Sequence, residues 1–204
     1  MVSNRTINAK RNITSGYVNK CISLLLPFIM RTVIIREFGE KYLGLGSLFS
    51  SILQVLSMAE LGFSSAIVFS LYKPLAEKNT STVCALLSYY KKIYRIVGSV
   101  ILVVGILLTS FLPYFIKDEV PSNINIYYLY LIFLINTVIS YFAFAYKSSL
   151  LVADQRQDLI NNTNTVILIF SFVIQVFLIF FFKNYYLYAI VEIFSTIFNN
   201  LTVA

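Results

Sequence analysis

Charged and strongly polar side chains occur inside long apolar stretches of this 204-residue chain, where a charge is costly. The first stretch has a polar residue or proline every three or four positions, which places them on one helix face: Lys20, Ser23, Pro27 and Arg31. A guanidinium suits phosphate because its planar donors bind two oxygens at once. Two interpretations stay open: an anion-attracting wall of a water-filled cavity, or basic side chains that extend to the membrane surfaces.

The second stretch carries a face of small hydroxyl residues around one amide: Ser47, Ser50, Gln54, Ser57 and Ser64. On membrane helices such residues serve close packing as well as ligand contact, and Glu60 at their flank is either an interfacial carboxylate or a functional one. Glu192, in the last stretch, lies at a depth similar to that of Arg31, which motivates the hypothesis of an ion pair. The expected substrate path comprises Lys20, Arg31, Gln54, Glu60 and Glu192.

Asp154 and Asp158, four residues apart around Arg156, could be mistaken for the magnesium–diphosphate motif of a membrane transferase. The signal is weak because this is a single pair in a loop, where polar residues are expected. The chain has no His, which removes the commonest general base and zinc ligand, and its two Cys lack metal-site spacing. We therefore expect no enzyme, no metal and no cofactor, and coupling of transport to a Na⁺ or H⁺ gradient stays open.

Six apolar stretches must position these side chains, and each is long enough for an α-helix to cross about 30 Å of hydrocarbon. They are 16–36, 42–70, 96–116, 124–146, 163–182 and 185–204. With 58% hydrophobic and 12% charged residues, the chain has too few charges to cover so much apolar surface in water. The sequence predicts an all-α integral membrane protein, with a six-helix transmembrane bundle over 16–204.

Three segments depart from a plain series of spans. Residues 1–15 are polar and basic, and we expect a cytoplasmic arm that is either an interfacial helix or disordered. The stretch 42–70 is too long for one straight crossing, and we expect a bend at Gly62. Residues 80–94 have apolar side chains at helical spacing and end in basic residues, which predicts an amphipathic helix on the inner leaflet that leads into the third span.

Lys and Arg residues are unevenly distributed between the two sides of the expected bundle. Eleven of the sixteen lie in the N-terminal segment and in the second-to-third and fourth-to-fifth connections. Only four lie on the other side, and Arg31 lies inside a span. Because cytoplasmic loops retain positive charge, we expect both termini in the cytoplasm. The net charge of +7 has the same origin, so we expect a lipid bilayer and not nucleic acid as the partner.

Short segments spread over much of the chain carry a resemblance to a known family: LGLGSLFS (43–50), AELGFSSAI (59–67), YKPLA (72–76), KIYR (92–95), YKSSLL (146–151) and ADQ (153–155). They are similar to segments of bacterial polysaccharide flippases of the Wzx type, in the multidrug/oligosaccharidyl-lipid/polysaccharide exporter superfamily. The resemblance implies alternating-access movement of undecaprenyl-diphosphate-linked oligosaccharide repeat units across the bacterial cytoplasmic membrane, for polysaccharide biosynthesis.

The resemblance also implies partners and residue roles. Members of this family typically have twelve or more spans in two bundles, so we expect this chain to be one lobe, continued beyond Ala204 by a second six-helix lobe. Other polysaccharide assembly proteins are further expected partners. Arg31 is the expected cavity cation for the diphosphate, and Glu60 is expected to serve helix packing or gating.

Three alternatives to a flippase stay open. A multidrug exporter of the same fold would need an anionic site for cationic drugs. An integral-membrane transferase or polymerase would need paired carboxylates, for which only Asp154 and Asp158 offer themselves. The third alternative is a non-transporting helical fragment that associates with other subunits.

Overall fold

The computed structural model describes residues 2–58, 61–116 and 120–204, without the side chains of 2–5, 61, 62 and 64. This part of the chain is 88% helical and has no strands, which confirms the all-α prediction. Its helices are α1 (Val2–Glu37), α2 (Glu40–Ser57), α3 (Leu61–Ala76), α4 (Thr80–Thr109), α5 (Leu112–Phe115), α6 (Ile126–Phe142), the 3₁₀-helix η2 (Ala145–Lys147), α7 (Ser148–Ala153), α8 (Gln157–Phe182) and α9 (Tyr185–Val203).

Four of the described helices are long and apolar enough to cross a membrane, namely α1 over Thr6–Glu37, α4, α8 and α9. A fifth is obtained if α6 and its continuation to Ala153, bent by 44°, count as one span. The expected span 42–70 is divided into α2, with 18 residues, and α3, with 16. A 16-residue helix is about 24 Å long, which is shorter than the hydrocarbon layer. The structure therefore supports four or five spans where we expected six.

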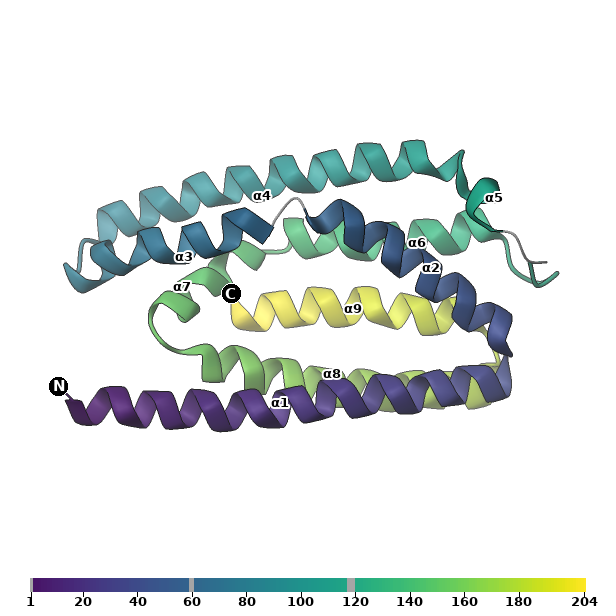
Figure 1. The fold of residues 1–204 in the computed structure, drawn as a ribbon, viewed down its shortest axis with the longest axis horizontal. Helices are drawn as coiled ribbons and strands as arrows, with labels where there is room; N and C mark the ends of the chain where they lie inside the picture. The colour runs from purple at the N-terminus through teal and green to yellow at the C-terminus, as the bar shows by residue number, and fades with distance from the viewer. Residues whose placement is uncertain (1, 59–60, 117–119) are drawn as a thin grey trace.

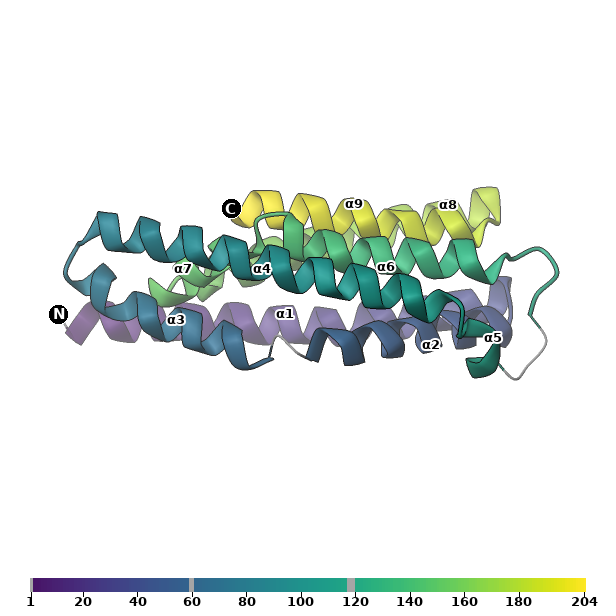
Figure 2. The ribbon, with the colours of Figure 1, turned by 90° about the horizontal axis from the view of Figure 1, so that it is seen from above.

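The long helices lie roughly along one common axis and give the molecule an elongated shape (Figures 1 and 2). In packing order, α1 contacts α8, α8 contacts α9, α9 contacts α6 and α6 contacts α4. α2 contacts both α1 and α6, so it bridges the two sides of the bundle, whereas α3 packs on α4 and α7. α9 thus packs against α8 on one side and α6 on the other, and it carries part of the site described below.

Two predicted segments belong to longer helices. The segment 1–15 was expected as a separate arm, but its residues from Val2 onward form the beginning of α1, which runs without a break for 36 residues through Pro27. Likewise 80–94 is the first half of α4, a single 30-residue helix whose side chains Val83, Tyr90 and Tyr94 are buried. The helical spacing of these apolar residues was read correctly, but they face α3 and α6 within the protein.

The expected bend at Gly62 lies near the boundary between α2 and α3. α2 ends at Ser57 with Met58 as its C-cap, and α3 begins at Leu61. Residues 59–60, and with them Glu60, lie outside the described residues.

Asparagine side chains start three of the helices. Asn79 accepts a hydrogen bond from the Thr82 amide at the start of α4, Asn125 caps α6, and Asn184 caps α9. Each side-chain oxygen satisfies a backbone N–H that has no partner in the first helical turn. The turn between α1 and α2 depends on Gly39, whose φ of 98° is disfavoured for residues with a side chain.

Glycine allows α4 to approach α6 closely. A Cβ atom on Gly105 would lie 2.4 Å from Cδ1 of Leu134, which is fully buried, and one on Gly98 would lie 2.8 Å from the Phe142 ring. The Gly105 carbonyl also accepts a hydrogen bond of 3.1 Å from the Tyr130 hydroxyl. Small residues that permit such approach are typical of helix packing in membranes.

Candidate functional site

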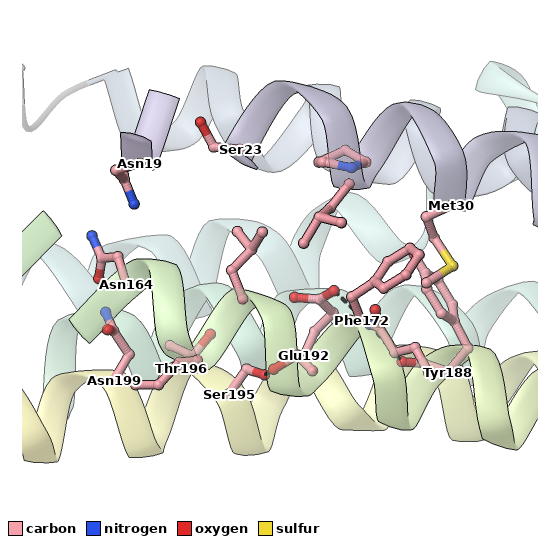
Figure 3. Close-up of a pocket in the computed structure, with 16 residues that line it drawn as sticks. Asn19, Ser23, Met30, Asn164, Phe172, Tyr188, Glu192, Ser195, Thr196 and Asn199 are labelled. Atoms are coloured by element: carbon pink, nitrogen blue, oxygen red, sulfur yellow. Dashed lines mark hydrogen bonds between the residues drawn. The ribbon is translucent and has the colours of Figure 1, made fainter. Parts of the chain in front are cut away.

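A polar cavity of about 500 Å³ lies between α1, α8 and α9. Figure 3 shows its side chains converging from the three helices. Its polar lining consists of amides, hydroxyls and one carboxylate: Asn19, Ser23, Asn164, Ser171, Gln175, Tyr188, Glu192, Ser195, Thr196 and Asn199. The apolar lining is Leu26, Pro27, Met30, Ile167, Leu168 and Phe172.

The polar lining follows from helical periodicity on α8 and α9. On α8, Asn164, Ser171 and Gln175 are spaced seven and four residues apart, which places them on one face. On α9, Glu192 and Asn199 are seven residues apart, and the hydroxyl residues between them lie on the same side. The exposed faces of α8 and α9 are largely apolar, and the polar face of each helix is turned toward the cavity.

The outer surface of α8 is apolar where the inner face is polar. Phe170, Val173 and Phe177 are all more than half exposed, whereas Gln175 on the same helix is 4% exposed. A water-soluble protein has the opposite arrangement, with apolar side chains inside. An apolar exterior around a polar interior is the arrangement expected for a hydrophilic route through lipid.

Gln175 fixes the carboxylate of Glu192. Its amide Nε2 donates a 2.6 Å hydrogen bond to Glu192 Oε1 and a 3.4 Å bond to the carbonyl of Tyr188. Because the amide is buried and aimed at the carboxylate, it orients Glu192 toward the cavity. A bond from an N–H to an ionised carboxylate is stronger than one between neutral groups.

Further hydrogen bonds hold α9 against its neighbours. The hydroxyls of Ser171 and Ser195 join α8 to α9. Toward α6, the Thr196 hydroxyl donates to Asn136 Oδ1 at 2.7 Å. The Asn200 amide donates to the carbonyl of Ser140 at 3.2 Å. The polar residues of α9 thus serve helix contact as well as the cavity.

A second cavity of about 420 Å³ lies between α2, α6 and α9. It is lined by Ser50, Leu53, Gln54, Ser57, Phe133, Asn136, Thr137, Tyr188 and Glu192. Tyr188 and Glu192 line both cavities, so these two residues lie at the boundary between them. The hydroxyl face predicted on α2 therefore lines this second cavity at Ser50, Gln54 and Ser57.

Of the five predicted path residues, Gln54 and Glu192 line these cavities. Lys20 and Arg31 are exposed on α1 and line neither one. They lie about 80–100° around α1 from the centre of the face that lines the first cavity. Arg31 is close enough to the Tyr188 hydroxyl to interact with it electrostatically. The fifth residue, Glu60, is not described.

The predicted ion pair between Arg31 and Glu192 is not formed. Both side chains are described, and Glu192 accepts its hydrogen bond from Gln175 instead. The two helix ends do lie at the same level, because Lys183 Nζ at the end of α8 is 3.9 Å from Glu37 Oε2 of α1. Matched depth was therefore not sufficient to bring the two charges together.

Asp158 is held by two arginines at the start of α8. Its oxygens lie 2.9 Å from Arg11 Nε and 3.3 Å from Arg156 Nε, and the residue is only 3% exposed. Its backbone N–H donates to the side chain of Asn12. Asp154, in contrast, is exposed. The two carboxylates thus have different environments, and Asp158 serves to attach the beginning of α1 to α8.

The contact between α1 and α8 continues as a seam of amides and hydroxyls. Asn161 Nδ2 donates to the Ser15 hydroxyl at 3.3 Å. Asn19 Nδ2 donates to the Asn161 carbonyl and to the Thr165 hydroxyl, at 3.1 and 3.0 Å. This seam leads directly into the polar cavity, which begins at Asn19.

Sequence reasoning missed most residues of the polar cavity. Charge within a span marked most of the predicted residues, and α8 has no charged residue between Asp158 and Lys183. The signal that could have found Asn164, Ser171 and Gln175 is their helical spacing in an otherwise apolar helix. No family model, no curated protein sequence and no solved structure matches the chain. The geometry of the site therefore carries the functional argument.

Proposed function

We propose that this protein moves a hydrophilic, lipid-linked oligosaccharide across the bacterial cytoplasmic membrane by alternating access, as one lobe of a flippase. The observation that carries the proposal is the polar cavity around Glu192, which lies beside an α8 whose outer surface is apolar. A polar cargo crossing lipid needs such an interior to replace water, whereas its prenyl tail remains in the bilayer. The sequence resemblance to Wzx-type flippases supports the same function.

The proposal requires a specific arrangement in the membrane. α2 and α3 together form one broken span, which brings the number of crossings to six. Both termini face the cytoplasm, in accord with the basic residues on that side. A second six-helix lobe completes the cavity wall on the face that carries Arg31, which is exposed here.

Two observations favour transport over the transferase alternative. Asp158, one of the two carboxylates that this alternative needs, forms ion pairs with Arg11 and Arg156. Asp154 is exposed and is separated from the cavity, whose lining begins at Asn19 on α1 and Asn164 on α8. The groups in the cavity itself can bind and orient a polar molecule by hydrogen bonds.

A multidrug exporter is the second candidate, and Glu192 favours it. The cavity contains this carboxylate, and none of its described lining residues is Lys or Arg. A carboxylate in a partly apolar pocket attracts cations. An exporter of this kind predicts that a host lacking the protein becomes sensitive to lipophilic cations while its surface polysaccharide remains normal.

Depletion of the protein in its host tests the proposal. We expect surface polysaccharide to fall and lipid-linked repeat units to accumulate on the cytoplasmic face of the membrane. Wild-type protein restores the surface glycan, and the Glu192→Leu variant, produced at equal level, restores it poorly. Normal surface glycan without accumulation of the intermediate refutes the proposal, and sensitivity to cationic drugs in the same strain would favour the exporter.

A further inference from the structure

The polar cavity between α1, α8 and α9 has buried hydrogen-bond acceptors that no group of the described residues satisfies. Oδ1 of Asn164 and Oδ1 of Asn199 are buried and have no partner. The Glu192 carboxylate can accept several hydrogen bonds, and Gln175 supplies one. Buried acceptors without a partner are unusual in proteins and call for a donor that the cavity can admit.

Other polar groups of the cavity are already committed to the protein. The Ser171 and Ser195 hydroxyls bond to each other. The Thr196 hydroxyl donates to Asn136, and the Asn19 amide donates to α8. These groups do not supply donors to the unpaired amide oxygens. The Tyr188 hydroxyl and the amide N–H groups of Asn164 and Asn199 are further donors in the lining, but none of them bonds to these oxygens in the described residues, which leaves room for donors from water or from a ligand.

The spacing of Glu192 and Asn199 along α9 does not favour a single metal ion as their shared ligand. Glu192 and Asn199 are seven residues apart on α9, which corresponds to about 10 Å along the helix. Oxygen ligands of Na⁺-sized or Ca²⁺-sized cations lie about 2.3–2.6 Å from the ion, so two ligands of one ion are within about 5 Å of each other. Acceptors on residues about 10 Å apart along the helix instead match a ligand with several separate donors.

A diphosphate fits this cavity poorly. Phosphate oxygens only accept hydrogen bonds, and they carry negative charge that Glu192 repels. None of the described lining residues is Lys or Arg, and the basic residues Lys20 and Arg31 lie on another face of α1. Sugar hydroxyls, in contrast, both donate and accept, so they satisfy amide oxygens and amide N–H groups alike.

We infer that this cavity binds the carbohydrate part of the cargo and excludes the diphosphate, which stays outside it on the side of Arg31. The cavity of about 500 Å³ lies within the usual range of ligand pockets, about 300–1,000 Å³. Phe172 and Tyr188 offer aromatic surface to the apolar face of a sugar ring (Figure 3). The inference rests on the proposed function for the identity of the cargo.

Protection of a cysteine in the cavity tests the inference. Leu168→Cys provides the reporter, because Leu168 lines the cavity without supplying a polar group. The exposed Cys21 and Cys84 are first replaced by serine. Labelling by a charged thiol reagent is followed with two probes: the repeat-unit oligosaccharide released by mild acid from the host's lipid-linked intermediates, and undecaprenyl diphosphate without sugar. At ten times its dissociation constant, a ligand in the cavity slows labelling about tenfold.

We expect protection by the oligosaccharide and none by undecaprenyl diphosphate. Protection by undecaprenyl diphosphate, whether or not the oligosaccharide also protects, overturns the inference, and so does protection by neither probe. Neither result bears on the proposed function, which the depletion experiment decides separately. If the oligosaccharide slows labelling at position 168 although depletion of this protein leaves the surface glycan unchanged, the cavity is a carbohydrate site of a protein that is not the flippase.

Variants of the unpaired acceptors sharpen the test. Asn164→Leu removes one acceptor, and the loss of one hydrogen bond weakens oligosaccharide binding about fivefold. Asn164→Asp keeps an oxygen acceptor in the same position and should retain more of the binding. Asn162→Leu is the matched control, because Asn162 is exposed on the same helix and does not line the cavity. Equal binding by all three variants contradicts the assignment of Asn164.

Discussion

The bond between Gln175 and Glu192 gives the most specific prediction for the site. Replacement of Gln175 by Leu removes the donor and leaves a half-buried carboxylate without its 2.6 Å hydrogen bond. A hydrogen bond to a charged group contributes about 1.5–3 kcal/mol to stability. We therefore expect the free energy of unfolding to fall by about 2 kcal/mol, which lowers the melting temperature by about 4–8 °C for a chain of this size.

A double-mutant cycle isolates this bond from other effects of the substitution. Gln175→Leu, Glu192→Leu and the double variant are unfolded by heat in the same detergent, and we expect a coupling energy of about 1.5–3 kcal/mol. Gln54→Leu is the control, because Gln54 is an exposed cavity residue whose side chain makes no hydrogen bond in the described part of the chain. Its effect should stay within about 0.5 kcal/mol.

The cycle can refute the account of Glu192. If the two substitutions are additive, the carboxylate is not held by Gln175, and its orientation toward both cavities has another cause. A large loss of stability in the control would show instead that any substitution in the cavity lining disturbs the bundle.

Two further predictions concern the helix contacts that position the site. Arg11→Met should lower the free energy of unfolding by about 1–2 kcal/mol, which is less than for a fully buried ion pair because the Arg11 side chain is 39% exposed. The control is Lys10→Met, which should change this free energy little because Lys10 is exposed and has no ion pair in the described residues. Equal effects of the two substitutions would exclude a specific ion pair between Arg11 and Asp158. Gly105→Ala should lower the free energy of unfolding by about 1–3 kcal/mol, because the added Cβ would lie 2.4 Å from a buried leucine methyl. The control is Gly44→Ala, whose Cβ would meet nothing within 4 Å; it should leave this free energy unchanged or raise it by up to about 1 kcal/mol. Thermal unfolding measures both variants, and a Gly105→Ala variant as stable as the wild type would contradict the close packing of α4 and α6.

The sequence predicted the helical class and the approximate positions of the long apolar helices, because length and hydropathy are local properties. It did not predict that α1 begins at Val2. The change from polar to apolar residues near Gly16 was taken as a boundary, but a change in polarity does not end a helix. The polar first half of α1 is held by Asp158 and Asn161, which are about 145 residues away in the sequence.

The candidate site was predicted in part, for a physical reason. Charge marked Glu192 and a hydroxyl stripe marked Gln54, and both line cavities. Arg31 was expected in a cavity because of its charge and depth, yet it is exposed and lies beside the lining face of α1 instead of on it. Which face of a helix meets its neighbours depends on long-range packing, which a local pattern does not contain. Gln175 was missed because one neutral amide changes the hydropathy of an apolar helix only slightly.

The central claim is that water reaches the interior of the bundle between α1, α8 and α9 while lipid covers its exterior. Ser171→Cys and Phe170→Cys, each in a background without Cys21 and Cys84, compare two adjacent residues of α8 in native membranes. Ser171 lines the cavity, and Phe170 is 67% exposed on the apolar outer surface. The account predicts that a charged, membrane-impermeant thiol reagent labels the cysteine at 171 and spares the one at 170. Labelling only at 170, or equal labelling at both positions, would contradict it.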